Sequence, residues 1–148
     1  MLLDLYCGAG TIGLSMAKDC RELVGVEIIP QAVENAKKNA DRNGIGNARF
    51  ICGDASQAAE QLKGEGIRPD VIVVDPPRKG LTPELIGTIV SMAPDRVVYV
   101  SCDPATLARD LKLFTEQDYS VEEITPVDMF PRTAHCESVV LMSRVETT

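Results

Sequence analysis

The sequence lacks any long apolar run, since no stretch approaches the roughly 20 residues that a membrane-spanning helix needs. Its five cysteines include no C-x-x-C pair. That spacing excludes a zinc ribbon, argues against a disulfide framework and favours a reducing, cytoplasmic setting. Positive charge is also scarce, because the net charge is −7, so the surface as a whole is not a nucleic-acid footprint. Nothing in the pattern indicates a metal site or a membrane partner.

The chain has 148 residues, of which 45% are hydrophobic and 25% charged. This length and composition are typical of one globular domain with a substantial core. The first buried strand begins at Met1 or Leu2, with no element before it to cover that side. We therefore expect residues 1–148 to be a single domain cut from a longer protein.

Apolar runs alternate with helical patterns along the chain. Runs rich in Val, Ile and Leu predict buried strands at 2–6, 23–26, 48–52, 71–74 and 97–100. Helices are predicted at 12–17, 31–43, 56–62, 83–92 and 104–114. Two extended runs, 119–125 and 136–143, follow with no helix between them. The pattern predicts an α/β fold with a mostly parallel sheet and an antiparallel pair at one edge.

A glycine-rich turn, residues 8–13, follows the first strand and opens the first helix. Its letters match G-x-G-x-x-G, the fingerprint of nucleotide-cofactor sites. Glu27 ends the second strand, where a carboxylate would receive ribose hydroxyls. Asp54 follows the third strand, where it could accept a hydrogen bond from an adenine amino group. These positions predict a site for a cofactor that contains a nucleoside.

The charge beside the turn helps to choose the cofactor. Asp4 lies in the first strand, and its carboxylate would repel the pyrophosphate that helix N-termini usually bind. It would suit the ammonium and sulfonium groups of S-adenosylmethionine. Together with Gly8, Gly10, Glu27 and Asp54, it makes the chain similar to the Rossmann-like S-adenosylmethionine-dependent methyltransferases. A nicotinamide-dependent oxidoreductase remains the distant alternative, supported by the literal glycine match alone.

Three further motifs follow later strands or join them. Asp-Pro-Pro-Arg-Lys-Gly at 75–80 follows the fourth strand, and this loop is expected to face the cofactor. Ser-Cys-Asp-Pro at 101–104 places Cys102 just before a helix N-terminus, which favours the thiolate. The segment 128–137 joins the two last extended runs and ends at Glu137. Taken singly, a lone cysteine more often packs in a core, and a carboxylate at a sheet edge is more often solvated.

In this order the motifs resemble those of the RNA (uracil-5-)-methyltransferases, over essentially the whole chain. The resemblance implies that Cys102 is the nucleophile and Glu137 the base. It implies a cofactor site lined by Tyr6, Thr11, Glu27, Asp54 and Asp75, with the backbone of Gly8 and Gly10 nearby. Arg78 is expected to position the target base and Arg132 to contact RNA. The family commonly has Asn where this chain has Asp103, a charge that is expected to raise the thiol pKa.

The resemblance implies methyl transfer from S-adenosylmethionine to carbon 5 of a uridine in RNA, leaving S-adenosylhomocysteine. The stretches 101–110 and 127–131 are more similar to the ribosomal RNA members, so 23S ribosomal RNA is the expected partner and transfer RNA the alternative. Family members typically carry N-terminal RNA-binding domains, which we expect to be missing here. An RNA cytosine-5-methyltransferase is a further alternative, although such enzymes usually place a cysteine after proline in the fourth-strand loop. A non-catalytic module that binds the cofactor also remains open.

Overall fold

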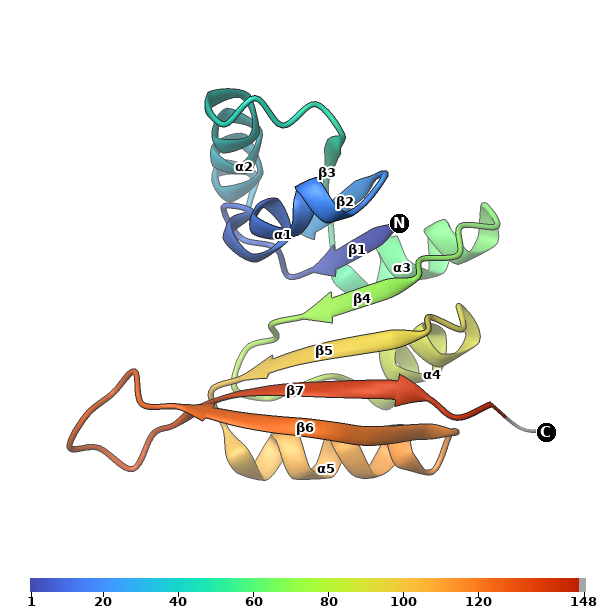
Figure 1. The fold of residues 1–148 in the computed structure, drawn as a ribbon. Coiled ribbons are helices and arrows are strands. Elements are labelled where there is room, and N and C mark those ends of the chain that lie inside the picture. The colour runs from blue at the N-terminus through green and yellow to red at the C-terminus, as the bar shows by residue number, and fades with distance from the viewer. Residues whose placement is uncertain (147–148) are drawn as a thin grey trace.

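The computed structural model describes residues 1–146 as one sheet with helices on both faces (Figure 1). The strands are β1 (Leu2–Leu5), β2 (Leu23–Glu27), β3 (Ala48–Cys52), β4 (Val71–Val74), β5 (Arg96–Ser101), β6 (Tyr119–Val127) and β7 (Glu137–Arg144). The helices are α1 (Thr11–Met16), the 3-10 helix η1 (Ala17–Asp19), α2 (Pro30–Arg42), α3 (Ala55–Gly64), α4 (Pro83–Ser91) and α5 (Pro104–Thr115). Every strand and helix predicted from the sequence is present, with ends that differ by at most two residues.

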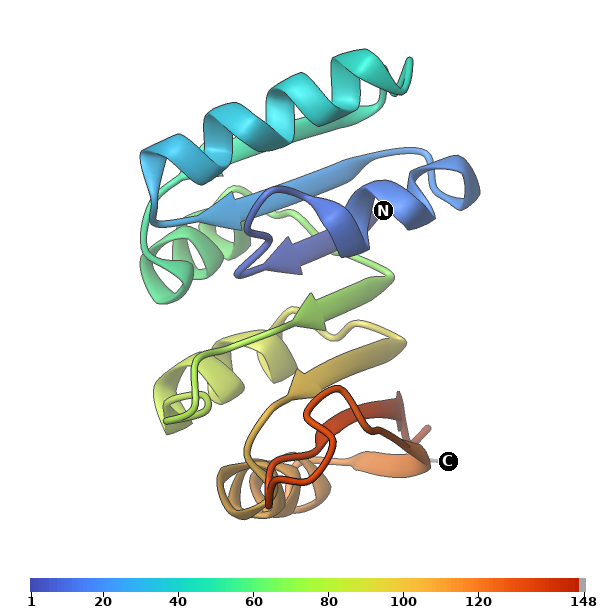
Figure 2. The same ribbon diagram turned by 90° about the vertical axis from the view of Figure 1, so that its left-hand side faces the viewer.

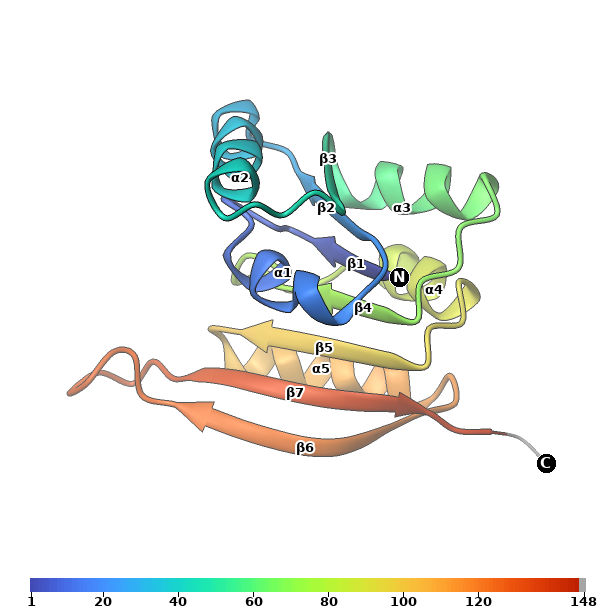
Figure 3. The same cartoon turned by 45° about the horizontal axis from the view of Figure 1, so that its top comes forward.

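The sheet has the strand order β3-β2-β1-β4-β5-β7-β6. Strands β1 to β5 are parallel, whereas β7 pairs antiparallel with both β5 and β6. Figure 3 shows β7 between these two neighbours. The predicted mostly parallel sheet with an antiparallel edge is therefore confirmed. The strand order reverses between β1 and β4, the place where open α/β sheets bind ligands.

The core lies in two layers, one on each face of the sheet (Figure 2). Helices α3, α4 and α5 pack on one face against alternate strand residues such as Leu3 and Val74. Helices α1 and α2 pack on the other face, against residues such as Leu23 and Val73. Burial on both faces explains why the central strands are almost continuously apolar in sequence. Within residues 1–146, no helix combines the length and apolar character needed to cross a membrane.

The connection between β6 and β7 extends past the sheet. The ladder between the two strands runs as far as the pair Val127 and Glu137, and residues 128–136 join them. Figure 1 shows this loop projecting on the side to which β1, β4 and β5 point. The amino end of β7 therefore lies at the edge where the parallel strands have their carboxyl ends.

Candidate functional site

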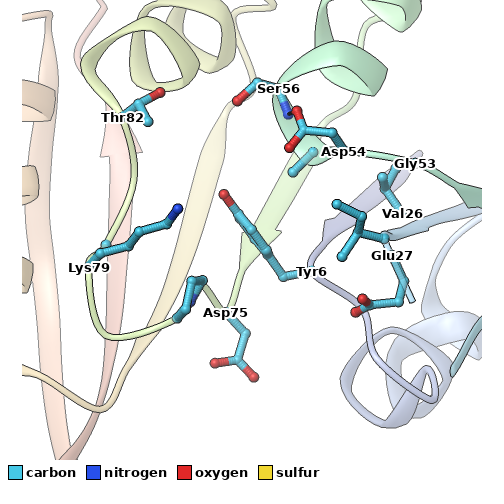
Figure 4. Close-up of a pocket in the computed structure, with 13 residues that line it drawn as sticks. Tyr6, Val26, Glu27, Gly53, Asp54, Ser56, Asp75, Lys79 and Thr82 are labelled. Atoms are coloured by element: carbon cyan, nitrogen blue, oxygen red, sulfur yellow. Dashed lines mark hydrogen bonds between the residues drawn. The ribbon is translucent and has the colours of Figure 1, made fainter.

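A pocket of about 380 Å³ opens at the carboxyl edge of the sheet, across the β1/β4 switch point. Four of the predicted cofactor residues line it: Tyr6, Glu27, Asp54 and Asp75. Each follows or ends a different parallel strand. Figure 4 shows the Tyr6 ring in the middle of the pocket, with Asp54 and Glu27 on one side and Asp75 below. The topology therefore gathers residues that are as many as 69 positions apart in sequence, because parallel strands end at a common edge.

Glu27 holds the glycine-rich turn against the end of β2. Its Oε2 accepts a hydrogen bond from the Gly8 N–H at 2.9 Å, and its Oε1 accepts one from the Ile29 N–H at 3.0 Å. A carboxylate has about four acceptor positions, so each oxygen retains capacity for a further donor. Two adjacent hydroxyl groups are the ligand chemistry that such a carboxylate suits.

Tyr6 turns the chain at the end of β1 in a left-handed conformation, with φ of 64°. A non-glycine residue in that region costs on the order of 1–3 kcal/mol, and such residues cluster at active and ligand sites. The turn brings the Tyr6 ring into the pocket. Burial, followed by the charge of Asp54, raises the pKa of its hydroxyl. The Tyr6 side chain is therefore neutral and offers the pocket an aromatic ring and a polar hydroxyl group.

Asp4 lies beneath the turn and is 1% exposed. Its Oδ2 accepts a hydrogen bond from the Gly13 N–H at 3.0 Å, while its Oδ1 is buried without a hydrogen-bond partner. A Cβ at Gly13 would lie 2.8 Å from Oδ2, so only glycine permits α1 to approach β1 this closely. Burial raises the pKa of Asp4 to about 7, with the charges of Asp75 and Glu27 adding to the effect. A buried carboxyl with an orphaned oxygen fits a site that receives a cation.

Asp54 begins α3 as its N-cap residue. Its Oδ1 accepts hydrogen bonds from the Ser56 and Gln57 N–H groups at 3.0 and 3.1 Å. The cap fixes the carboxylate at the rim of the pocket and leaves Oδ2 available to a ligand amino group. The carboxylate acceptors of Glu27 and Asp54 in the pocket, with the buried Asp4 beneath the turn, thus fit the adenosyl and cationic parts of S-adenosylmethionine.

The second group of predicted residues converges beside this pocket. In the antiparallel β5/β7 ladder the last pair is Ser101 with Ser138, so Cys102, which follows Ser101, and Glu137, which precedes Ser138, both lie at this end of the ladder. The pKa of Asp75 is raised by burial and then by the charge of Glu137. The ends of β4, β5 and β7 therefore bring a thiol and two carboxyls to one edge.

Cys102 sits immediately before α5. The neighbouring Asp103 is the N-cap, and its Oδ1 accepts hydrogen bonds from the Ala105 N–H at 2.9 Å and the Thr106 N–H at 3.0 Å. These bonds, that of Thr106 first, lower the pKa of the Asp103 carboxyl. The negative charge that replaces the expected Asn is thus directed at the helix N-terminus.

The remaining predicted residues lie around the pocket rather than in it. Gly8 and Gly10 form the turn beside Glu27, and Thr11 begins α1 and lines a separate groove between α1 and α2. Arg78 is exposed on the loop between β4 and α4, and Arg132 is exposed on the β6–β7 loop. The pocket residues that the sequence reasoning did not name as site residues include Ile28, Gly53, Ser56, Lys79 and Thr82. The first three follow strand ends within four residues, so the strand-end rule could have found them.

Comparison with known proteins identifies the relatives of this chain. The family model described as tRNA (Uracil-5-)-methyltransferase matches residues 1–145. An uncharacterized RNA methyltransferase of Bacillus cereus is 53% identical over 145 residues, covering 98% of this chain and 32% of the relative. One of Enterococcus faecalis is 51% identical over 144 residues, covering 97% and 32%. The chain thus spans about a third of the length of these relatives.

Two solved structures share the fold. The tRNA (uracil-54, C5)-methyltransferase of Pyrococcus abyssi, in complex with S-adenosyl-L-homocysteine, superposes with a TM-score of 0.79 at 35% identity, covering 95% of this chain and 33% of that one. A precorrin-6y C5,15-methyltransferase of Geobacter metallireducens has a TM-score of 0.76 at 13% identity, covering 97% and 79%, which is a likeness of fold alone. The fold is the Rossmann-like methyltransferase fold that the motifs predicted. With a family model that matches almost its whole length, the chain belongs to the RNA (uracil-5-)-methyltransferase family.

Proposed function

We propose that this domain transfers a methyl group from S-adenosylmethionine to carbon 5 of a uridine in RNA. The observation that supports the proposal is that β4 and β5 end, and β7 begins, at the edge of the sheet where the pocket opens, which brings Asp75, Cys102 and Glu137 to that edge. An oxidoreductase needs no thiol and carboxylate pair at this edge, and the chain belongs to a family of uracil-5-methyltransferases. Five unpaired cysteines are consistent with action in the reducing cytoplasm.

The pocket residues have distinct roles in holding the cofactor under this proposal. Glu27 receives the ribose hydroxyls, and Asp54 receives the adenine amino group through the oxygen that the helix cap leaves available. Asp4 balances the cationic end of the molecule from beneath the glycine-rich turn. When bound, S-adenosylmethionine supplies the electrophilic methyl group that carbon 5 of uracil takes up. S-adenosylhomocysteine is the product, as found in the related Pyrococcus abyssi structure.

The chain's own residues make carbon 5 reactive. The thiolate of Cys102 forms a bond to carbon 6 of the ring, and the electron pair of the 5,6 double bond moves toward carbon 5 and the adjacent carbonyl. Arg78 positions the base and stabilises the charge on that oxygen, with Asp75 holding the base in register. After methylation Glu137 removes the remaining proton from carbon 5. The freed electron pair restores the double bond and expels the Cys102 thiolate.

The substrate is proposed to be ribosomal RNA, with 23S ribosomal RNA first. The sequence of segments 101–110 and 127–131 supports this choice. Transfer RNA is the second candidate, favoured by the description of the family model and by the Pyrococcus abyssi relative. We further propose that residues 1–148 are the catalytic domain of a longer enzyme whose N-terminal regions supply most of the RNA binding. A net charge of −7 leaves Arg132 and Arg78 as local contacts rather than a general phosphate surface.

The test uses RNA in which 5-fluorouridine replaces uridine. Fluorine cannot leave as a proton, so the thioether between Cys102 and the ring should persist and be seen by intact-mass analysis of the protein with S-adenosylmethionine. Cys102→Ala should form no adduct yet bind the cofactor as the wild type does. Cys20→Ala is the matched control, because Cys20 lies at the opposite end of β2 from the pocket.

The same assay separates the alternatives. Fragments of 23S ribosomal RNA and whole transfer RNA, each carrying 5-fluorouridine, should differ in the rate of adduct formation, with the ribosomal RNA faster. An adduct with 5-fluorocytidine RNA instead would establish a cytosine-5-methyltransferase. Wild-type protein that binds S-adenosylmethionine but forms no adduct with any of these RNAs would overturn the proposed chemistry for this domain.

A further inference from the structure

The loop between β4 and α4, residues 75–82, carries Asp75 and Arg78 and forms one wall of the pocket. Its shape depends on one internal turn, in which the Gly80 N–H donates to the Pro77 carbonyl at 2.9 Å. Beyond that turn, side chains from α5 hold its backbone. The Thr106 hydroxyl donates to the Arg78 carbonyl at 2.9 Å, and the Leu81 N–H donates to the Asp110 carboxylate at 2.8 Å. The loop is thus shaped by residues about 30 positions away in sequence.

Arg109 supplies the other contacts from α5. Its Nη2 donates to the Lys79 carbonyl at 2.8 Å and to the Leu81 carbonyl at 3.2 Å. The same guanidinium pairs with Asp110, with Nε and Nη2 at 2.9 and 2.8 Å from Oδ1. A planar, forked donor is needed to reach two carbonyls and a carboxylate at once.

Asp110 is the centre of this arrangement and is 0% exposed. Its Oδ2 accepts the Leu81 N–H and also the Tyr99 hydroxyl at 2.7 Å, while Arg109 binds its Oδ1. A buried carboxylate is tolerated only when its oxygens are satisfied by charged or polar donors, as here. The Asp110 carboxylate therefore has three partners, Tyr99, Arg109 and the Leu81 N–H, and the last of these belongs to the loop backbone.

Gly80 shows how closely the loop approaches the carboxylate. Its φ is 72°, and a Cβ there would lie 2.5 Å from Asp110 Oδ2 and 2.8 Å from Arg109 Nη2. No side chain fits between the loop and the buried pair. The loop rests directly on the polar side chains of α5.

The N-terminal end of α5 adjoins Cys102. The Thr106 hydroxyl lies 3.3 Å from the Asp103 carbonyl as well as 2.9 Å from that of Arg78. Thr106, Arg109 and Asp110 lie at helical spacings of three and four, on one face of the helix. One rigid helix thus begins at the nucleophile and holds the loop of Asp75 and Arg78.

We propose that Thr106, Arg109 and Asp110 are positioning residues that fix the loop of Asp75 and Arg78 relative to Cys102. The inference rests on the function proposed above and extends it to a set of residues that touch neither substrate nor cofactor. A small displacement of groups that orient a substrate lowers the rate of the chemical step more than binding. Loss of the contacts should therefore lower kcat and leave the KM for RNA nearly constant.

The test uses variants that spare the buried carboxylate, because Asp110→Ala is expected to destabilise the core. Thr106→Val removes one hydroxyl from a partly exposed position, and Arg109→Lys keeps the charge but removes the fork. Each should lower the rate of 5-fluorouridine adduct formation about tenfold, equivalent to ~1.4 kcal/mol in the barrier. Thr106→Ser keeps the hydroxyl and should form the adduct at the wild-type rate. Lys112→Gln, at an exposed position of α5, is the matched control and should also keep the wild-type rate.

Hydrogen exchange provides a readout independent of activity. Amides of residues 78–82 should exchange faster in Thr106→Val and Arg109→Lys, while amides of the central strands should be unchanged. If the contacts only stabilise the fold, the variants will lower Tm with kcat and loop exchange as in the wild type, and the proposal is overturned. Failure of the wild type to form any adduct would instead contradict the proposed function, so the two failures are distinguishable.

Discussion

Asp4 gives the sharpest quantitative prediction. Burial raises its pKa from the ordinary value of 3.8 to about 7. Between these values the native chain binds more protons at this residue than the unfolded chain does, so the free energy of unfolding falls as pH rises. One pKa unit corresponds to about 1.4 kcal/mol, so the ionised side chain costs the native state roughly 4 kcal/mol above pH 7. Most of this change, roughly 2–3 kcal/mol, falls between pH 5 and pH 8.

The assay is urea unfolding at a series of pH values for the wild type and Asp4→Asn. The Asn side chain can still accept the Gly13 N–H but cannot ionise, so its stability should lack the decline between pH 5 and pH 8. Its amide NH₂ takes the place of Oδ1, which already lacks a hydrogen-bond partner in the wild type, so any change in stability from this exchange is independent of pH and leaves the slope unaffected. Asp41→Asn, exposed on α2, is the control and should follow the wild type. A difference between wild type and Asp4→Asn that is constant over this range would refute the burial argument.

Three further predictions concern packing, the cofactor and the base. Gly25→Ala should lower the free energy of unfolding by about 1–3 kcal/mol in urea titrations. The reason is that the new Cβ would lie 2.6 Å from Phe50 Cδ1 and 2.9 Å from Cys7 Sγ. An unchanged urea midpoint would contradict this packing. Asp54→Ala should lose about 1 kcal/mol of stability with its cap, whereas Asp54→Ser keeps the cap, and calorimetry should show weaker S-adenosylmethionine binding in both. Wild-type affinity in the serine variant would exclude the adenine contact. Glu137→Gln should accumulate a covalent adduct with ordinary uridine RNA, because carbon 5 keeps its proton; normal turnover by mass spectrometry would remove Glu137 from that role.

The sequence predicted the strands well because the central sheet is buried on both sides. Runs such as Val71–Val74 have apolar side chains on each face of the sheet. Such strands appear in the sequence as short continuous apolar segments, which are easy to recognise. The strand-end rule then predicts the pocket, since Tyr6, Glu27 and Asp54 all belong to carboxyl ends of parallel strands. The local sequence pattern and the sheet topology were together sufficient to predict these three pocket residues.

The loop of residues 75–82 could not be predicted in the same way. Its motif predicted that residues 75–80 face the cofactor, but not that the Lys79 side chain enters the pocket or that Thr82 also lines it. The loop conformation depends on the carbonyl and N–H contacts with Arg109 and Asp110, whose distance in sequence hides the link. The burial of Asp4 was hidden for a related reason, because its exposure depends on how closely α1 approaches β1.

The antiparallel direction of β7 explains how Glu137 reaches the site. Parallel strands deliver residues to this edge only from their carboxyl ends, as β4 and β5 do for Asp75 and Cys102. A parallel strand in the place of β7 would leave its first residue at the opposite edge, about a strand length away. Because β7 runs antiparallel to β5, its first residue lies at the edge that Cys102 and Asp75 share, and the charge of Glu137 contributes to the raised pKa of Asp75. The reversal at the end of the sheet therefore brings the proposed base, Glu137, to the same edge as the proposed nucleophile, Cys102.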